Sequence, residues 1–584
     1  MGVRIRWIAV DRLLTGSVGP QTGAAMGRRD IFTFIVGGRA GAGVKKSGAT
    51  VSNLFSSMKR HVFQMDDYQS LIRGGHNFVA TTTSVRRVTS HYMRADLLVA
   101  LDARSVEVHR DHLAQGGVLV YNSDEVESDE LPDGPETIGL PLHSLAKEHP
   151  DPELRLGLAG PAALAAVIGL SGEELGRLVE TEYKRDLDAN RSFAGAVYRA
   201  VSEKAGGRFE LESGEAELPL LTGNEAIAMG ACASGLDVYL AYPMTPASTI
   251  LHFLAAHADE LGVTTMQPES EIAVANLAIG AAAMGARTMV GTSGGGFALM
   301  EEAFSLAGMA EVPFLAALSS RPGPSTGVPT YTEQADLSFA LNQGHGDFPR
   351  VVASPGSVEE GYRLAAELMS LVWELQVQGI LLTEKHLSES RATVALDLED
   401  APDATPRLHD GGEYRRYAFT DDGVSPLVFP PSDELINWSS YEHDEMGMTT
   451  EDGFEITAMH DKRNRKLSTL TGRLKKMKTV NRYGDGGPVI ATYGSTTLSV
   501  LEALRAGGIE ATVVQPIYLR PFPVWDLEGL RESRPVVVEQ SSTGQFATLL
   551  SDKLGVRPTA EIRKYDGRAF DPEDLAAELG DKIG

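Results

Sequence analysis

Two short stretches of this sequence are the most informative: YPMTPAST at residues 242–249 and QPESEIAVAN at residues 267–276. The first places Thr245 in a turn between two prolines, which fix their own backbone angles and restrict the residue before each of them. The second places Glu271 at the start of a helix that is rich in alanine and glycine. This succession of strand, polar turn and helix is typical of an α/β fold with parallel strands.

Thr245 has two interpretations. We predict a helix over 247–261 and a short strand over 263–267 after the turn. Thr245 could cap that helix, as hydroxyl side chains often do. Alternatively, because the prolines hold its hydroxyl in one direction, Thr245 could bind a ligand.

Glu271 also has two interpretations. A carboxylate in the first turn of a helix often only complements the helix dipole, which contributes ~0.3–1 kcal/mol. Here, however, the helix over 271–283 is apolar on nearly every face, which predicts that it is buried. A buried carboxylate requires a partner, so a binding or catalytic role for Glu271 follows from the second interpretation.

A glycine-rich turn follows the next predicted strand. Residues 287–293 are a predicted strand, the glycines 294–296 form a turn, and 298–310 are a predicted helix. Such a junction lets a ligand approach the backbone closely and offers donors from the helix start. The segment 291–295 also matches GxSxG, so a hydrolase with Ser293 as the nucleophile is an alternative. Three histidines could complete such a site: His345, His386 and His409.

Arg321 follows a predicted strand over 312–319 and precedes a loop rich in proline and glycine. A guanidinium group at a strand end can bind a carboxylate through two hydrogen bonds. The alternative is an arginine that pairs with a nearby acid on the surface.

Composition limits the function classes. The formal net charge of -26 argues against a general nucleic-acid binder, which needs a basic face. No apolar run approaches the ~18 residues of a membrane helix, so we expect a cytoplasmic protein without a membrane span. The single cysteine, Cys232, excludes an internal disulfide and any cysteine-ligated cluster built by this chain alone.

The length of 584 residues predicts several domains. We expect an α/β protein with three domains, each built on a doubly wound or parallel sheet. Within the first segment, Met26 is the expected start of the folded protein. The predicted segments are an N-terminal extension (1–29), a first domain (30–205), a linker (206–218), a second domain (219–395), an irregular connection (396–482) and a third domain (483–584).

A second glycine-rich turn, at 37–43, separates a predicted strand over 31–36 from a helix over 44–61. The turn either permits close packing or binds an anion at the helix N-terminus. The anion-binding residues would be Gly38, Gly41 and Gly43.

Eight basic residues lie between positions 462 and 478. They form either a solvated helix face or an anion-binding site, which would involve Lys475 and Lys476. His443 stands beside three acids and could bind a metal. Because no second histidine follows at helical spacing, we expect hydrogen-bonded structure and no metal site there.

The motifs at 242–249 and 267–276, the glycines 294–296 and the sequence RPGPSTG at 321–327 resemble the large subunit of the 2-oxoacid:ferredoxin oxidoreductases. The 2-oxoglutarate type, with a gamma domain fused in front of the alpha part, is the most similar. The resemblance implies a gamma domain, a thiamine-diphosphate pyrimidine-type domain and a transketolase C-terminal-like domain.

The resemblance also implies roles for individual residues. Glu271 would hydrogen-bond the aminopyrimidine of thiamine diphosphate and promote its activation. Thr245 and Arg321 would bind the 2-oxoacid. The expected cofactor-binding residues are Pro243, Glu271, Thr292, Ser293, Gly294 and Gly295.

A thiamine site needs a second domain for the diphosphate and Mg²⁺, and this chain shows no such motif. Gly484-Asp485-Gly486 is not followed by paired asparagines and is expected to be a turn. The resemblance therefore implies a beta subunit that carries Mg²⁺ and a [4Fe-4S] cluster, with ferredoxin as acceptor, coenzyme A as co-substrate, and a dimer of heterodimers. Alternatives are a pyruvate or branched-chain 2-oxoacid enzyme, or a noncatalytic assembly subunit.

Overall fold

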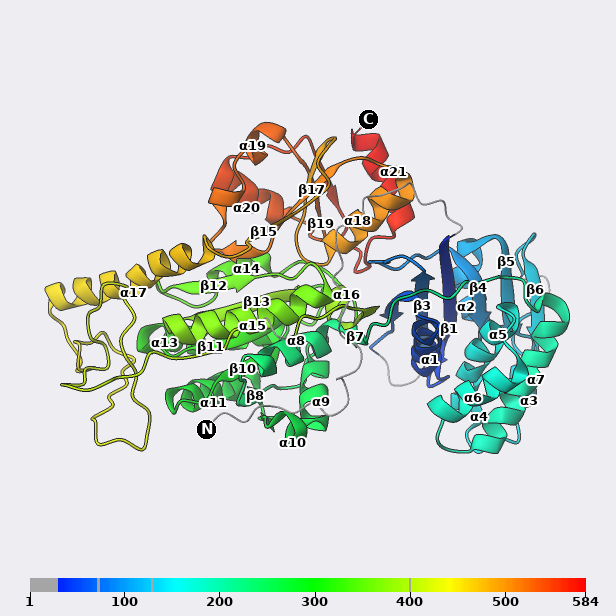
Figure 1. Cartoon of the computed structure of the whole chain (residues 1–584), viewed down its shortest axis with the longest axis horizontal. Helices are drawn as coiled ribbons and strands as arrows, with labels where there is room; N and C mark the ends of the chain where they lie inside the picture. The colour runs from blue at the N-terminus through cyan, green and yellow to red at the C-terminus, as the bar shows by residue number, and fades with distance from the viewer. Residues whose placement is uncertain (1–29, 71–73, 128–130, 399–400, 584) are drawn as a thin grey trace.

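The computed structural model describes residues 30–70, 74–127, 131–398 and 401–583. In these residues the strands form three sheets of eight, seven and five strands. The first sheet lies at one end of the molecule, and the second and third lie next to each other (Figure 1). Helices pack against the sheets, so the predicted α/β class is confirmed. None of the helices described is both long and apolar enough to cross a membrane.

The N-terminal sheet is mixed, whereas the prediction was a parallel or doubly wound sheet. Its first strands are β1 (Ile31–Ala40), β2 (His61–Asp67), β3 (Gly74–Ser84), β4 (Ala95–Ala100), β5 (Leu113–Asn122) and β6 (Glu136–Leu140). Strands β1, β4, β5 and β6 run parallel, while β3 pairs antiparallel with both β1 and β2.

The helices of this unit are α1 (Val44–Ser57), α2 (Ala103–His109), α3 (Leu142–Ala146), α4 (Pro152–Arg155), α5 (Ala159–Val167), α6 (Gly172–Glu182) and α7 (Leu187–Ala205). The expected loop over 37–43 is wrong in its first half. Gly37 and Gly38 belong to β1, because they pair with Phe78 and Asn77 of β3.

Two short strands from beyond the linker complete the N-terminal sheet, β7 (Leu220–Thr222) and β14 (Arg391–Thr393). β14 pairs with β2, and β7 pairs with β14, both antiparallel. The two ends of the segment predicted as the second domain therefore add strands to the sheet of the first.

The second sheet is parallel except at one edge. Its strands are β8 (Val238–Leu240), β9 (Thr264–Met266), β10 (Thr288–Thr292), β11 (Phe314–Ser320), β12 (Arg350–Ala353), β13 (Gln378–Glu384) and β18 (Tyr518–Arg520). The order is β18-β12-β13-β11-β10-β8-β9, and β18, contributed by the third unit, is antiparallel to β12.

The helices around this sheet are α8 (Gly223–Ala233), α9 (Ser248–Ala256), α10 (Ala258–Leu261), α11 (Glu271–Ala283), α12 (Gly294–Leu299), α13 (Glu301–Ala310), α14 (Leu337–Asn342), α15 (Val358–Leu375) and α16 (Lys385–Glu389). The predicted helix over 247–261 is interrupted at His257, whose backbone is not helical. The predicted glycine loop at 294–296 is wrong, because these residues form the first turn of α12.

The C-terminal unit contains a five-stranded sheet. Its strands are β15 (Val480–Tyr483), β16 (Val489–Ala491), β17 (Thr512–Pro516), β19 (Val536–Glu539) and β20 (Ala560–Arg563), and its helices are α18 (Thr496–Gly507), α19 (Leu530–Ser533), α20 (Gln545–Leu554) and α21 (Pro572–Ile583). The sheet is parallel except for β15. The largest cluster of buried apolar side chains runs through the second and third sheets together.

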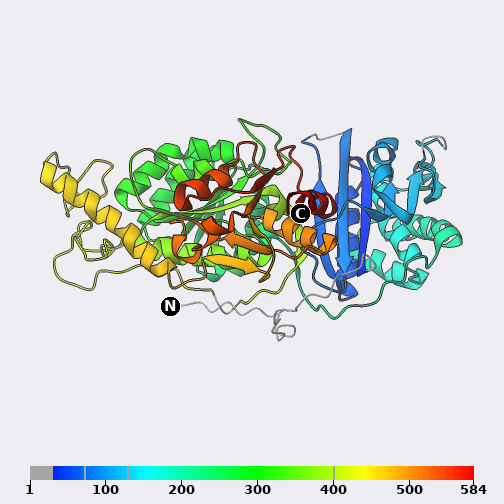
Figure 2. The same cartoon turned by 90° about the horizontal axis from the view of Figure 1, so that it is seen from above.

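Residues 401–474 form a projection that we call the arm. It consists of an irregular stretch followed by the long helix α17 (Gly453–Leu474), whereas the sequence interpretation expected a helix face only around the basic residues 462–478. Figures 1 and 2 show the arm standing out from the end of the molecule opposite the N-terminal unit.

A buried ionic cluster anchors the arm. Glu311, which follows α13, accepts from Lys462 at 2.7 Å and lies 2.5 Å from the ammonium group of Lys466. Burial would raise the pKa of Glu311, but the two lysines and Arg416 lower it well below its usual range. Both interpretations of the basic residues are therefore wrong for Lys462 and Lys466, which face neither solvent nor a phosphate.

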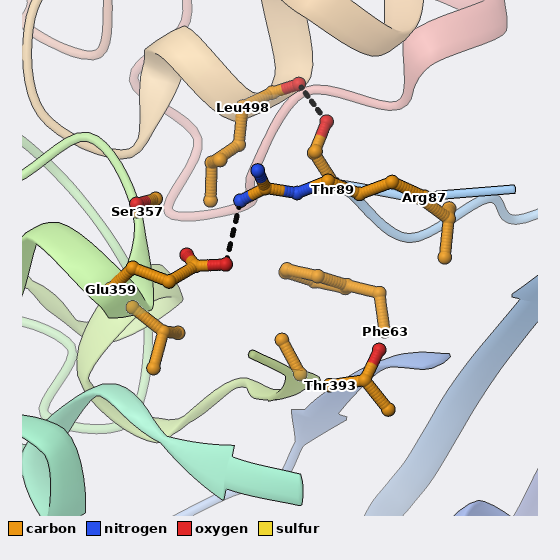
Figure 3. A pocket seen from close by; sticks show the side chains of 10 residues that line it. Phe63, Arg87, Thr89, Ser357, Glu359, Thr393 and Leu498 are labelled. Atoms are coloured by element: carbon orange, nitrogen blue, oxygen red, sulfur yellow. Dashed lines mark hydrogen bonds and ion pairs between the residues drawn. The ribbon is translucent and has the colours of Figure 1, made fainter. Parts of the chain in front are cut away.

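The N-terminal unit contacts both other units around a small pocket (Figure 3). Arg87 forms an ion pair with Glu359 of α15 at 2.7 Å. The Thr89 hydroxyl donates to the carbonyl of Leu498 in α18 at 3.3 Å, and its backbone amide donates to the buried Glu502 at 2.7 Å. Side chains of all three units thus line one junction.

Candidate active site

Most of the predicted site residues lie at one edge of the second sheet. Strands β11, β10, β8 and β9 are parallel neighbours, so their carboxyl ends meet at this edge. Crevices beyond the carboxyl ends of parallel strands are the usual ligand sites of α/β proteins. Thr245 follows β8, Glu271 follows β9, Ser293 follows β10 and Arg321 follows β11.

Glu271 is the first residue of α11, and Ser270 caps that helix by accepting from the amide of Ala273 at 3.3 Å. The Glu271 side chain is buried, with 4% of its surface exposed. Its Oε1 atom has no hydrogen-bond partner in the described part of the chain. An unpaired buried carboxylate oxygen is costly, so the structure calls for a donor that the described residues do not supply.

The first turn of α12 packs directly against Glu271. A β-carbon placed at Gly296 would lie 2.2 Å from Thr292 Oγ1, 2.6 Å from Glu271 Cγ and 2.8 Å from Glu271 Oε1. Glycine at 296 is therefore required by close approach, and Thr292 and Glu271 are brought together. The Ser293 hydroxyl is also buried and has no partner among the described residues.

The two residues predicted to bind the substrate, Thr245 and Arg321, are hydrogen-bonded to each other. Arg321 Nη1 donates to the carbonyl oxygen of Thr245 at 2.8 Å. The capping interpretation of Thr245 is wrong, because α9 starts at Ser248 and its N-cap residue is Ala247. Asn224, in the capping-box helix α8, holds the same turn by donating to the carbonyl of Pro246 at 2.8 Å.

Asp336 lies between the start of α12 and Arg321, and the sequence interpretation gave it no role. Its Oδ2 accepts from the Ser320 hydroxyl at 2.5 Å, and a β-carbon at Gly294 would lie 2.7 Å from its carboxylate oxygens. Burial raises the pKa of Asp336, although Ser320 and Arg321 lower it in part. Burial lowers the pKa of Arg321, and Asp336 opposes this.

A second acid lies in the same loop. Burial, together with the charge of Asp336, raises the pKa of Glu333 to about 7. No local signal could have identified Glu333 and Asp336, since their environment is made by residues distant in sequence.

The predicted burial of α11 on all faces is wrong. Three large apolar residues on this helix or at its end, Ile272, Leu277 and Met284, are between 44% and 53% exposed. Pro243 and Gly295 are exposed near the same edge, whereas Gly294 is only partly exposed. The edge that holds Glu271 therefore has an open apolar border.

The predicted anion-binding glycines lie in the N-terminal unit, away from this edge. A β-carbon at Gly38 would press on Leu101 and Val44, and one at Gly43 would lie 2.4 Å from the carbonyl oxygen of Leu154. Close packing thus explains both glycines, while Gly41 is exposed.

Lys475 and Lys476 are exposed at the end of α17. The Lys475 ammonium lies 5.6 Å from the ring centre of Trp525. Lys475 and Lys476 therefore lie in a different unit from Gly38, Gly41 and Gly43, the other residues predicted to bind an anion.

The hydrolase alternative finds no geometric support. His345 is hydrogen-bonded to Ser305 at 2.9 Å, and His409 contacts the carbonyl of Gly412 at 3.3 Å. His386 is buried, and neither of its ring nitrogens has a partner within the described ranges. His443 bonds the carbonyl of Tyr441 at 2.9 Å, and the described residues contain no group of three or more side chains placed to hold a metal.

Known proteins match this chain over most of its length. The family described as "Pyruvate flavodoxin/ferredoxin oxidoreductase, thiamine diP-bdg" matches residues 229–461, and "Pyruvate ferredoxin/flavodoxin oxidoreductase" matches residues 33–200. The 2-oxoacid:ferredoxin oxidoreductase subunit alpha of Sulfolobus sp is 30% identical over 94% of this chain and 96% of its own. The 2-oxoglutarate oxidoreductase subunit KorA of Mycobacterium tuberculosis is 28% identical over 83% of this chain and 80% of its own.

A solved structure is also similar. It is the 2-oxoglutarate:ferredoxin oxidoreductase from Magnetococcus marinus with 2-oxoglutarate, coenzyme A and succinyl-CoA bound. Its TM-score is 0.86, with 27% identity, and the match covers 95% of this chain and 100% of that one.

Proposed function

Because this chain belongs to the 2-oxoacid:ferredoxin oxidoreductases as an alpha subunit, we propose that it binds the aminopyrimidine of thiamine diphosphate through Glu271 and acts on 2-oxoglutarate. The choice of 2-oxoglutarate is supported by the relatives named as KorA and by the substrate bound in the Magnetococcus marinus enzyme. Pyruvate and branched-chain 2-oxoacids are the alternative substrates.

The observation that supports the cofactor role is the unpaired Oε1 atom of Glu271. A ring nitrogen that carries a proton would satisfy this oxygen, so the residue fits the aminopyrimidine. When bound, thiamine diphosphate supplies the nucleophilic carbon that adds to the 2-oxo group and holds the electron pair left by CO2. The Glu271 carboxylate would accept a hydrogen bond from the ring N–H, and the close packing of Gly296 against Glu271 would hold the carboxylate in place.

Arg321 and Thr245 are proposed to hold the substrate carboxylate. A guanidinium has five N–H donors, and the hydrogen bond to the carbonyl of Thr245 uses only one. That bond fixes the guanidinium direction, and the remaining donors can bind a carboxylate in a bidentate manner. Partial burial strengthens such a contact because it lowers the local dielectric.

We infer that a beta subunit completes the enzyme with the Mg²⁺-diphosphate motif and a [4Fe-4S] cluster. The single cysteine supports this division of labour, because burial raises the pKa of Cys232 to about 12 and keeps its thiol protonated. Ferredoxin would accept the electrons and coenzyme A the acyl group, in a dimer of heterodimers. Gly38, Gly41, Gly43, Lys475 and Lys476 remain proposed contacts for coenzyme A phosphates.

The variant Glu271→Gln tests the assignment. Gln has the same size but lacks the negative charge that stabilises a protonated ring nitrogen, so the complex with the beta subunit should lose at least ~100-fold in turnover. Exchange of the C2 proton of bound thiamine diphosphate, followed by NMR, should slow in parallel. Normal turnover with unchanged proton exchange would remove the proposal, and circular dichroism would show that the variant is folded.

The substrate is tested separately. The purified complex should be assayed with 2-oxoglutarate, pyruvate and a branched-chain 2-oxoacid, each with coenzyme A and a low-potential acceptor. A higher kcat/KM for pyruvate than for 2-oxoglutarate would refute the substrate while leaving the role of Glu271 in place.

A further inference from the structure

Exposed apolar side chains are distributed unevenly over this molecule. Among the described residues, seventeen large hydrophobic side chains are exposed, and thirteen of them lie between positions 242 and 454. Six belong to the arm, and their exposure ranges from 45% for Phe419 to 88% for Phe454. These six residues are Leu408, Phe419, Leu435, Tyr441, Met448 and Phe454. Such a concentration marks an interaction surface.

The arm is held in place and does not expose these residues through disorder. Its helix α17 is anchored by the buried pairs of Glu311 with Lys462 and Lys466. Within the arm, Arg463 binds Glu442 through two hydrogen bonds of 2.8 and 2.5 Å. The apolar side chains are thus presented by a preorganised structure, which lowers the entropic cost of binding.

The arm touches the end of α11, a helix that also exposes apolar side chains. A β-carbon at Gly285, just after α11, would lie 2.9 Å from the ring of Phe429, so the arm contacts the end of this helix. The neighbouring Met284 is 53% exposed, and the exposed face continues through Leu277 to Ile272, next to Glu271. The arm and α11 lie toward the same end of the molecule (Figure 1).

The charge of the arm indicates what kind of chain covers it. The arm, residues 401–474, contains fourteen acidic and eight basic residues, and four of the basic ones, Arg416, Lys462, Arg463 and Lys466, are buried. A second copy of this chain, with a net charge of -26, would meet this surface with charge of the same sign. A partner with a basic and apolar face is complementary.

We propose that the arm and the exposed face of α11 form one docking surface for the beta subunit that completes the cofactor site. This inference rests on the proposed function, because that function requires a second chain next to Glu271. The arm would contact the beta subunit and position it against the edge of the second sheet at which Glu271 lies.

The double variant Leu435→Asp, Phe454→Asp tests the docking surface. Both side chains are highly exposed, and an aspartate at 454 lies in the first turn of α17, where negative charge is favourable, so the fold should persist. Leu154→Asp is the matched control, since Leu154 is 46% exposed in the N-terminal unit. Each full-length chain is titrated with separately purified beta subunit, and both complex mass and 2-oxoacid-dependent dye reduction are measured.

The double variant should need at least tenfold more beta subunit for half-maximal activity, whereas activity at saturation should stay unchanged. The Leu154→Asp control should match the wild type. An unchanged half-saturation concentration would overturn the proposal. So would a loss of self-association without any change in beta-subunit affinity, because the surface would then bind a second copy of this chain.

The test separates this inference from the proposed function. The Glu271→Gln chain should bind the beta subunit with wild-type affinity and fail in turnover, which is the opposite of the result expected for the arm variant. If Glu271→Gln turned over normally while the arm variant still weakened assembly, only the proposed catalytic role would fail.

Discussion

Replacement of Gly296 by alanine tests the contact between α12 and Glu271. Gly296 does not have a positive φ, so alanine meets no backbone strain there. The added β-carbon would instead lie 2.2 Å from Thr292 Oγ1 and 2.6 Å from Glu271 Cγ. Distances this short force the Glu271 carboxylate or the start of α12 to move.

The expected effect on stability is modest, but the effect on activity is large. Overpacking of a buried site costs ~1–3 kcal/mol. Alanine in place of a helical glycine regains up to ~1 kcal/mol, so the net loss is about 0–2 kcal/mol. A misplacement of about 1 Å at a catalytic group can lower the rate ~100-fold. Turnover should therefore fall far more than stability does.

Two measurements check this expectation: thermal unfolding of the chain, and dye reduction by its complex with the beta subunit at saturating thiamine diphosphate. Gly176→Ala in α6 is the control, because the described chain leaves open space around a β-carbon there. The control should gain ~0.5–1 kcal/mol and keep full activity. If Gly296→Ala behaved like the control in both measurements, the packing argument for Glu271 would be refuted.

Three further outcomes are expected. Burial raises the pKa of Glu384 from 4.5 to about 7, so the folded chain keeps this carboxyl protonated over a pH range in which the unfolded chain has lost the proton. The free energy of unfolding of the wild type therefore falls as the pH rises from 4.5 to 7. Glu384→Gln should be up to ~3 kcal/mol more stable than the wild type at pH 8 and little different at pH 4, measured by denaturant unfolding. Glu311→Gln leaves Lys462 and Lys466 buried without a counter-charge and should lose ~3–5 kcal/mol, seen as a lower thermal midpoint. Arg321→Lys keeps the charge but removes the planar fork, so KM for the 2-oxoacid should rise about tenfold in steady-state kinetics, with a smaller change in kcat.

The local parts of the site could be predicted because they depend on neighbours in the chain. Thr222 and Glu225 form a capping box at the start of α8, and the predicted helix start at Glu271 is confirmed. Both follow from side chains three residues apart, which lie together in any helix start. The turn at 484–486 was predicted for the same reason, because its glycines suit a tight turn.

Charged residues of the arm were interpreted wrongly because their partner is distant in sequence. The sequence around Lys462 and Lys466 is rich in basic residues, which by itself indicates an exposed helix face. Glu311 lies 151 positions before Lys462, and nothing in the local sequence links the two residues. Asp336 received no role for a similar reason, since its contacts with Ser320 and Gly294 arise only when the chain is folded.

Residue order alone was sufficient for the α/β class, the polar turns after the strands and the assignment of Glu271 to a helix start, since each depends on short-range geometry. The pairing of β7 and β14 with the first sheet, the anchoring of the arm and the exposed side of α11 required the assembled molecule. A helix of small apolar residues has no distinct polar side, so its sequence does not specify which side is covered. That is set by the neighbours that reach it, from distant parts of this chain and, as we propose, from a second one.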